Sequence, residues 1–176
     1  MNGIEFYKMS GSGNDFILID NRNGQMESND CFEFAKMVCR RRMSVGADGL
    51  IIIEDSDTAD FRWQFINADG SEADMCGNGA RCAARYAFLK VIASREMSFD
   101  TLAGVIEAFV GDGTVKIRKT DPFALKPQLS LAVAGSEINV GSVNTGVPHV
   151  VALVEDIESV DVLKTGRLIR NHPDFS

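Results

Sequence analysis

The chain of 176 residues is long enough for one domain or for two small lobes. A composition of 45% hydrophobic, 24% charged and 8% aromatic residues is typical of a globular protein and excludes a disordered or collagen-like chain. The 25 acidic and 18 basic residues leave a net charge of -7, which repels a phosphate backbone. We therefore expect a small-molecule partner and no nucleic acid.

The four cysteines are too few and too irregularly spaced for a disulfide scaffold, and the two histidines complete no zinc pattern, so we expect no metal. The start of the chain lacks the basic and hydrophobic regions of a signal peptide. The longest aliphatic run, residues 50–53, is far too short to span a membrane. The sequence therefore predicts a cytoplasmic protein without a membrane partner.

The first elements are expected to be two short strands and a helix. Residues 4–9 and 16–20 have the pattern of strands on either side of a polar loop, 10–15, whose two glycines let the chain approach a ligand closely. Asp30 and Glu33 have the spacing of a helix-capping pair, and apolar residues then recur at helical spacing to about residue 42. The two cysteines in this helix are expected in the core.

Further strands follow. Residues 50–54 are predicted as a buried strand, and the alternation in 61–66 predicts a strand with one hydrophobic face. Segments 104–110 and 114–119 flank Gly111-Asp112-Gly113, which is typical of a hairpin. Strands and helices in this mixed order predict an α+β fold with a largely antiparallel sheet.

Residues 121–127 break both periodicities with two prolines and are predicted as the lobe boundary. The expected division is an N-terminal lobe, 1–121, and the start of a second lobe, 122–176. Three elements are expected in the second part: strands 137–143 and 147–155, and a helix within 157–170.

The most informative stretch surrounds Cys76. A turn-rich run, 67–75, leads to this cysteine, then to Gly77-Asn78-Gly79 and a run with helical spacing, so Cys76 is predicted at or just before a helix N-terminus. Free backbone N–H groups of Gly77 and Asn78 would hold a carboxylate there, and the same partial positive charge favours a thiolate. A base beside an anion-binding turn suits removal of a proton next to a carboxylate. The simpler interpretation, in which this cysteine only packs beneath a loop, stays open.

Four motifs, residues 8–16, 46–49, 67–81 and 143–150, resemble diaminopimelate epimerase in the same order and at similar spacing. The resemblance implies two pseudo-symmetric lobes, each wrapping a sheet around a helix, with the active site in the cleft between them. It also implies an epimerase that interconverts LL- and meso-2,6-diaminopimelate, in lysine and peptidoglycan precursor synthesis, without any cofactor.

The resemblance assigns six residues to the site: Cys76 and His149 to catalysis, and Asn14, Asn67, Gly77 and Asn78 to substrate binding. Cys76 matches one of two catalytic cysteines, and His149 matches a residue that tunes a catalytic thiol. Gly77 and Asn78 match the residues that bind the substrate carboxylate. Without the resemblance, the histidine would be interpreted as a loop residue.

The chain also departs from the family pattern. Gly49 and Val147 stand where some members carry a Gln and an Asn that touch substrate. The second catalytic cysteine, in a Cys-Gly-Thr-Gly-like motif after a Glu-Arg pair, has no match, and residues 167–176 resemble a segment partway through the second lobe. We therefore expect an incomplete second lobe and no turnover by this chain alone.

Three hypotheses remain open: half of an epimerase, a noncatalytic carboxylate-binding fragment, or a racemase of another amino acid on the same fold. An isomerase of the phenazine-biosynthesis type is disfavoured by the cysteine motif. A homodimer is allowed, although nothing in the sequence selects an oligomeric state.

Overall fold

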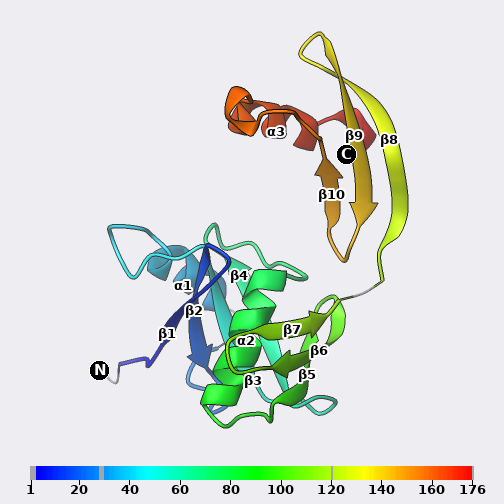
Figure 1. Cartoon of the computed structure of the whole chain (residues 1–176). Coiled ribbons are helices and arrows are strands. Elements are labelled where there is room, and N and C mark those ends of the chain that lie inside the picture. The colour runs from blue at the N-terminus through cyan, green and yellow to red at the C-terminus, as the bar shows by residue number, and fades with distance from the viewer. Residues whose placement is uncertain (1–2, 28–29, 120, 176) are drawn as a thin grey trace. The chain divides into compact units, whose positions relative to one another are not determined.

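The computed structural model describes residues 3–27, 30–119 and 121–175, and the chain forms two compact units, residues 1–119 and 120–176. The first unit holds a seven-stranded sheet whose spatial order follows the sequence (Figure 1). Neighbouring strands pair antiparallel, except that β2 is parallel to β3 and β4 to β5. The strands are β1 (Tyr7–Gly11), β2 (Asn14–Asp20), β3 (Gly49–Glu54), β4 (Phe61–Asn67), β5 (Glu96–Thr101), β6 (Gly104–Val110) and β7 (Val115–Arg118). The predicted α+β fold with a largely antiparallel sheet is confirmed.

Two helices cover opposite faces of this sheet: α1 (Cys31–Val38) and α2 (Gly77–Leu89). β3 lies between them, so that Ile52 joins the core beneath α1 and Ile51 joins the core beneath α2, both fully buried. The edge strands β1 and β7 also contact α2 (Figure 1). The sheet therefore curves around α2, and the whole unit is organised about that helix.

The prediction of one hydrophobic face for residues 61–66 was wrong. Trp63 packs on the α2 side as expected, but Ile66 is fully buried in the α1 core and Gln64 is 9% exposed. The second face is covered because α1, formed by a distant part of the sequence, packs against β4. Alternation of polar and apolar residues indicates the strand but does not show what covers its other face.

Helix α1 ends at Val38, short of its predicted end. The returning chain supplies the reason: the N–H groups of Gly46 and Ala47 donate to the carbonyls of Val38 and Cys39, at 2.9 and 3.1 Å. These bonds satisfy carbonyls at the end of the helix, so a further helical turn is not needed to satisfy them. Asp30 is the N-cap residue, as the predicted capping pair requires, but its side chain makes no cap hydrogen bond, so that part of the prediction was wrong. Both cysteines of this segment are buried, as expected.

The predicted hairpin is confirmed: β6 and β7 pair antiparallel, and the turn is closed by a hydrogen bond from Gly111 N–H to the Thr114 carbonyl at 2.9 Å. The strand β5 was not predicted. It pairs with β4 on one side and β6 on the other.

The second unit holds a three-stranded sheet in the order β10-β9-β8, and α3 packs on β8 (Figure 1). Its small core consists of Leu131, Val133, Val140 and Ile169. The elements are β8 (Phe123–Val133), β9 (Ser136–Asn144), β10 (Pro148–Val151), η1 (Ile157–Ser159), α3 (Val162–Arg170) and η2 (Pro173–Phe175).

Two predictions in this unit need correction. Residues 123–127 of the predicted break, 121–127, belong to β8, because register shifts around Lys126 interrupt the ladder and accommodate Pro127, which has no N–H to donate. The predicted helix over 157–170 is divided, and α3 starts anew where the Asp161 carboxylate accepts from Lys164 N–H at 3.0 Å. The strand expected over 147–155 is limited to β10.

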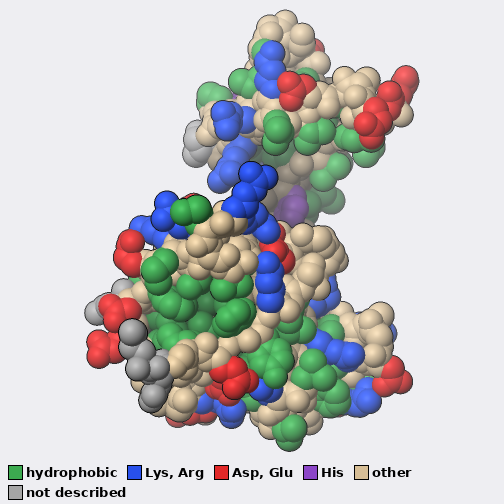
Figure 2. Space-filling model, turned by 90° about the vertical axis from the view of Figure 1, so that its left-hand side faces the viewer, with side chains coloured by type: hydrophobic (Ala, Val, Ile, Leu, Met, Phe, Trp, Pro, Cys, Tyr) green, Lys and Arg blue, Asp and Glu red, His purple; other side chains and the backbone are tan. Residues whose placement is uncertain are grey.

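The first unit also carries exposed apolar side chains, among them Phe6, Tyr7, Met37 and Met43. Figure 2 shows hydrophobic side chains gathered on one face of the first unit, with basic and acidic side chains around them. This face is therefore an apolar surface bordered by charges of both signs, not a surface of one charge.

Candidate functional site

The N-terminus of α2 is where the predicted chemistry lies. Cys76 is the N-cap residue, with an extended backbone (φ -140°, ψ 113°), and its Sγ accepts the Gly79 N–H at 3.4 Å. The first helical hydrogen bond runs from Ala80 N–H to the Cys76 carbonyl at 2.8 Å. The N–H groups of Gly77 and Asn78 precede that bond, so they have no partner within the helix. The predicted position of Cys76 at a helix start is confirmed.

Cys76 differs from the other cysteines in its surroundings. It is half-buried, whereas Cys31, Cys39 and Cys82 are buried, and all four are free thiols. Burial raises the pKa of Cys39 and of Cys82 to about 11, and burial also raises the pKa of Cys31. The buried thiols are therefore protonated at neutral pH, and Cys76 is the thiol that a ligand can reach.

A hydrogen-bonded chain joins this helix start to the sheet. Asn78 Nδ2 donates to Asn14 Oδ1 at 2.7 Å, and Asn14 Nδ2 donates to Asp48 Oδ2 at 3.0 Å. On the helix side, Arg81 Nη2 donates to Asn78 Oδ1. Asn14 begins β2 and Asp48 directly precedes β3. Side chains far apart in sequence are thus tied into one polar group.

Basic side chains form ion pairs at the Asp48 end of this hydrogen-bonded series. Arg41 Nη2 lies 2.7 Å from Asp48 Oδ1 and 2.6 Å from Asp15 Oδ1, and Lys8 Nζ lies 3.1 Å from Asp15 Oδ2. The hydrogen bond from Asn14, with help from Arg41, lowers the pKa of Asp48. The hydrogen bond from Arg41 holds the pKa of Asp15 well below its usual range. Both carboxylates are therefore ionised at neutral pH.

Asn67 lies at the same edge of the sheet. It ends β4 and pairs with Gly49 at the start of β3, while Gly49 pairs on its other side with Phe16 of β2. The side-chain amide of Asn67 donates to Ser71 Oγ at 3.0 Å. The starts of β2 and β3 and the end of β4 therefore bring Asn14 and Asn67 to one edge.

Gly49 leaves no space for a side chain. A Cβ built there would lie 2.6 Å from Phe65 Cε2 and 2.9 Å from the Ile66 carbonyl oxygen. A longer residue at this position would therefore require the β3–β4 pair to move, which accounts for glycine here in physical terms.

His149 belongs to the second unit. It lies on β10, exposed, and its Nδ1 is 2.8 Å from the Val147 carbonyl oxygen. Because a carbonyl only accepts, Nδ1 carries the proton in this contact, and in that tautomer Nε2 is the acceptor. The first unit thus brings five of the six predicted residues to one region, Asn14, Asn67, Cys76, Gly77 and Asn78, whereas His149 belongs to the second unit.

Sequence reasoning missed Asp48 and Arg81 as parts of this group. Both were inside motifs that carried the resemblance, Gly46-Ala47-Asp48-Gly49 and the cysteine motif that runs to Arg81. A conspicuous motif was the available signal. The partner of Asp48, Asn14, comes from a distant segment, whereas the partner of Arg81, Asn78, lies three residues earlier on the same helix.

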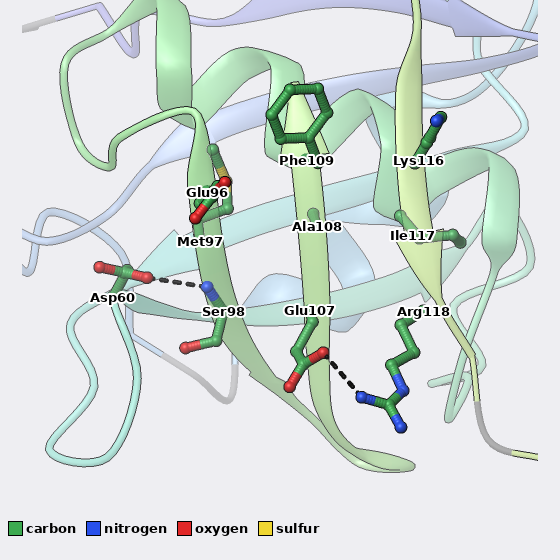
Figure 3. A pocket seen from close by; sticks show the side chains of 10 residues that line it. All are labelled: Asp60, Glu96, Met97, Ser98, Glu107, Ala108, Phe109, Lys116, Ile117 and Arg118. Carbon is green, nitrogen blue, oxygen red and sulfur yellow. Dashed lines mark hydrogen bonds and ion pairs between the residues drawn. The ribbon is translucent and has the colours of Figure 1, made fainter. Parts of the chain in front are cut away.

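A separate hollow of about 760 Å³ lies on β5, β6 and β7 (Figure 3). In its lining, Arg118 and Glu107 form an ion pair at 3.3 Å, and the Ser98 N–H donates a hydrogen bond to Asp60 at 2.8 Å. None of the predicted site residues lines it. Because Glu107 and Arg118 are paired with each other and no predicted site residue lines this hollow, we assign it no chemistry.

Within residues 3–27, 30–119 and 121–175, no group of three or more His, Cys, Asp or Glu side chains is placed to hold a metal ion. In the same part of the chain, every helix is too short or too polar to cross a bilayer.

A family model described as diaminopimelate epimerase matches residues 6–122. The chain is 46% identical over 183 residues to the diaminopimelate epimerase of Aquifex aeolicus (strain VF5), an alignment that covers 98% of this chain and 65% of that protein. The chain therefore spans about 65% of the length of this relative.

Two solved structures share the fold. A phenazine biosynthesis protein of the PhzF family from Bacillus anthracis superposes with a TM-score of 0.67 at 18% identity, over 90% of this chain and 58% of that one. A hydroxyproline epimerase from Agrobacterium vitis, solved with bound trans-4-hydroxy-L-proline, superposes with a TM-score of 0.65 at 13% identity, over 93% of this chain and 53% of that one. At such identities the likeness supports the fold alone, and it agrees with the predicted fold class.

Proposed function

The chain belongs to the diaminopimelate epimerase family, and we propose that it carries one half of the machinery that interconverts LL- and meso-2,6-diaminopimelate. The observation that carries the proposal is the placement of Cys76 as the N-cap of α2, half-buried, beside two backbone N–H groups that have no partner within the helix. The thiol then faces the α-proton of a bound amino acid, and the N–H groups of the turn face the carboxylate on the same α-carbon.

The reaction needs no cofactor in this scheme. The Cys76 thiolate takes the α-proton, so that the C–H bond breaks and an S–H bond forms. The electron pair moves into the α-carboxylate, whose added charge is met by the N–H groups of Gly77 and Asn78. A second thiol on the opposite face returns a proton to the carbon. In the reverse direction Cys76 is the acid and the second thiol is the base.

The remaining predicted residues have supporting roles. We assign the side chains of Asn14 and Asn67 to contacts with the bound amino acid. His149 is assigned to tuning a catalytic thiol, and the Nδ1 contact with Val147, in which Nε2 is the ring's acceptor, supports that assignment. The N-terminal lobe, 1–121, supplies Cys76, and residues 122–176 begin the second lobe. We place the enzyme in the cytoplasm, and a homodimer is consistent with the proposal.

The 176-residue chain alone is proposed to bind diaminopimelate without turning it over, because no second cysteine motif of the family has a match in it. The test is incubation of residues 1–176 with LL-diaminopimelate in D₂O. Calorimetry is expected to show binding, and mass spectrometry is expected to show neither α-deuterium nor the meso isomer. Turnover by this chain would contradict the proposal of inactivity.

The catalytic role of Cys76 is tested in a version completed with the second-cysteine segment of the family. That version is expected to incorporate α-deuterium, and Cys76→Ser is expected to abolish the incorporation. Cys82→Ser is the matched control, because Cys82 lies on the same helix but is buried. Exchange that persists in Cys76→Ser would remove the assigned role.

A noncatalytic carboxylate-binding fragment is the second candidate, and the open N–H groups at the start of α2 favour it equally. Binding without exchange in the completed version would select it. A racemase of another amino acid is the third candidate, and a binding panel in which another amino acid displaces diaminopimelate would select that one.

A further inference from the structure

Building on the proposed function, we propose that Arg81 and Asp48 are positioning residues, which fix the side-chain amides of Asn78 and Asn14 in one orientation at the bound amino acid. The four side chains form a continuous chain: Arg81 donates to Asn78 Oδ1, Asn78 Nδ2 donates to Asn14 Oδ1 at 2.7 Å, and Asn14 Nδ2 donates to Asp48 Oδ2 at 3.0 Å. It links the first turn of α2 to the starts of two strands.

The orientation of the two amides is set by the residues at either end of the hydrogen-bonded series, Arg81 and Asp48. A guanidinium can only donate hydrogen bonds, and a carboxylate can only accept them. A flip of either amide would place two oxygens or two N–H groups against each other, at Arg81, at Asp48 or between the two amides. Neither amide can therefore turn while both ends are present, and an amide that cannot turn presents one set of atoms to a ligand.

Both ends are themselves held. Asp48 Oδ2 also accepts the Asp15 backbone N–H at 3.1 Å, and Asp48 Oδ1 accepts from Arg41 at 2.7 Å. Arg81 folds back along α2, so that its Nη1 lies 3.8 Å from the position of a Cβ at Gly77. The guanidinium therefore lies at the turn proposed to hold the carboxylate.

The next turn of α2 provides a matched control. Arg85 is also half-buried, but its guanidinium donates to the backbone carbonyls of Gly111 and Asp112, at 2.9 and 3.2 Å. It has the same charge as Arg81 and no contact with either asparagine among the hydrogen bonds of the described residues. Loss of Arg85 removes a cation from the same helix and leaves the chain of amides unchanged.

A purely electrostatic role of these charges makes the opposite prediction at Asp48. Asp48→Asn removes a negative charge, which alone would tighten the binding of a carboxylate. The asparagine in its place can turn either its oxygen or its N–H toward Asn14, so the amide direction is lost and binding weakens. The sign of the effect therefore distinguishes positioning from charge.

The experiment measures diaminopimelate affinity by calorimetry on residues 1–176. We expect Arg81→Met and Asp48→Asn each to weaken binding by about 10-fold, as for a lost hydrogen bond to a charged group. Arg85→Met is expected to stay within about 2-fold, and Arg81→Lys, which keeps a donor, is expected to recover part of the affinity. Arg41→Met controls for the ion pair that Asp48→Asn also disrupts. Tighter binding by Asp48→Asn, or equal effects of Arg81→Met and Arg85→Met, would overturn the proposal.

The side-chain amide signals of the two asparagines, in ¹H–¹⁵N spectra without ligand, provide a second readout. In the wild-type chain these signals are expected to be shifted away from free amide positions, to move toward them in Arg81→Met, and to stay in place in Arg85→Met. Unchanged signals in Arg81→Met would refute the positioning role. If the wild-type chain fails to bind diaminopimelate, the proposed function fails, and these spectra still decide the role of Arg81.

Discussion

The side-chain amide of Asn78, in the first turn of α2, donates to Oδ1 of Asn14, the first residue of β2, at 2.7 Å. These residues are 64 positions apart in the sequence. The contact connects the segment that carries Cys76 to the sheet, so that the start of α2 and the start of β2 lie together.

Cys76 is expected to react with iodoacetamide about 10-fold faster or more than the other three cysteines at pH 8. It is the half-buried thiol, while Cys39 and Cys82 are buried and have a pKa of about 11. Peptide mass spectrometry over a time course measures the order of labelling. Cys76→Ser should abolish the fast phase and Cys82→Ser should leave it, and early labelling of Cys82 would contradict this placement.

Gly11→Ala is expected to destabilise the chain by about 1–3 kcal/mol. A Cβ at Gly11 would lie 2.9 Å from the Asn78 carbonyl oxygen and 3.1 Å from Cys82 Sγ, so β1 or the start of α2 must shift. Urea unfolding measures the change. Gly113→Ala is the control, because a Cβ there meets nothing within 4 Å. Equal stability of the two variants would show that β1 does not approach α2 this closely.

Gly49→Gln, which introduces the residue that some family members carry, is expected to destabilise the chain by about 1–3 kcal/mol and to leave diaminopimelate binding no tighter. The added Cβ would lie 2.6 Å from Phe65 Cε2. Unfolding in urea and calorimetry on the same preparation test both expectations, with Gly113→Gln as the control at an open turn. A stable Gly49→Gln with tighter binding would mean that this position accepts the family side chain after all.

Acid is expected to weaken the first unit through Asp15 and Asp48. Both have a pKa below the ordinary value of 3.8, so their ionised forms stabilise the folded state. That contribution is fully present above pH 3.8 and is lost as the pH falls through the lower folded values.

The urea midpoint of Arg41→Met should therefore lie below that of the wild type at pH 7, and the gap should shrink at pH 3. Arg40→Met is the control, because Arg40 forms no ion pair within the described part of the chain. If the difference in urea midpoint between the wild type and Arg41→Met is the same at pH 7 and pH 3, the ionised carboxylates are not its cause.

Local patterns predicted the elements well where each depended on its own residues. The hairpin around residues 111–113 and the start of α2 after Cys76 are examples. Predictions were wrong where a distant segment decided the outcome. The end of α1 depends on Gly46 and Ala47 returning to it, and the burial of Gln64 depends on what covers the second face of β4.

The sequence by itself determined that Cys76 begins a helix, since glycines and helical spacing after the cysteine act over a few residues. The tertiary structure alone decided that Asn78 meets Asn14 and that Asn14 meets Asp48. The physical reason is that these contacts require strands β2 and β3 to pair in parallel and the sheet to curve around α2, which no local pattern specifies.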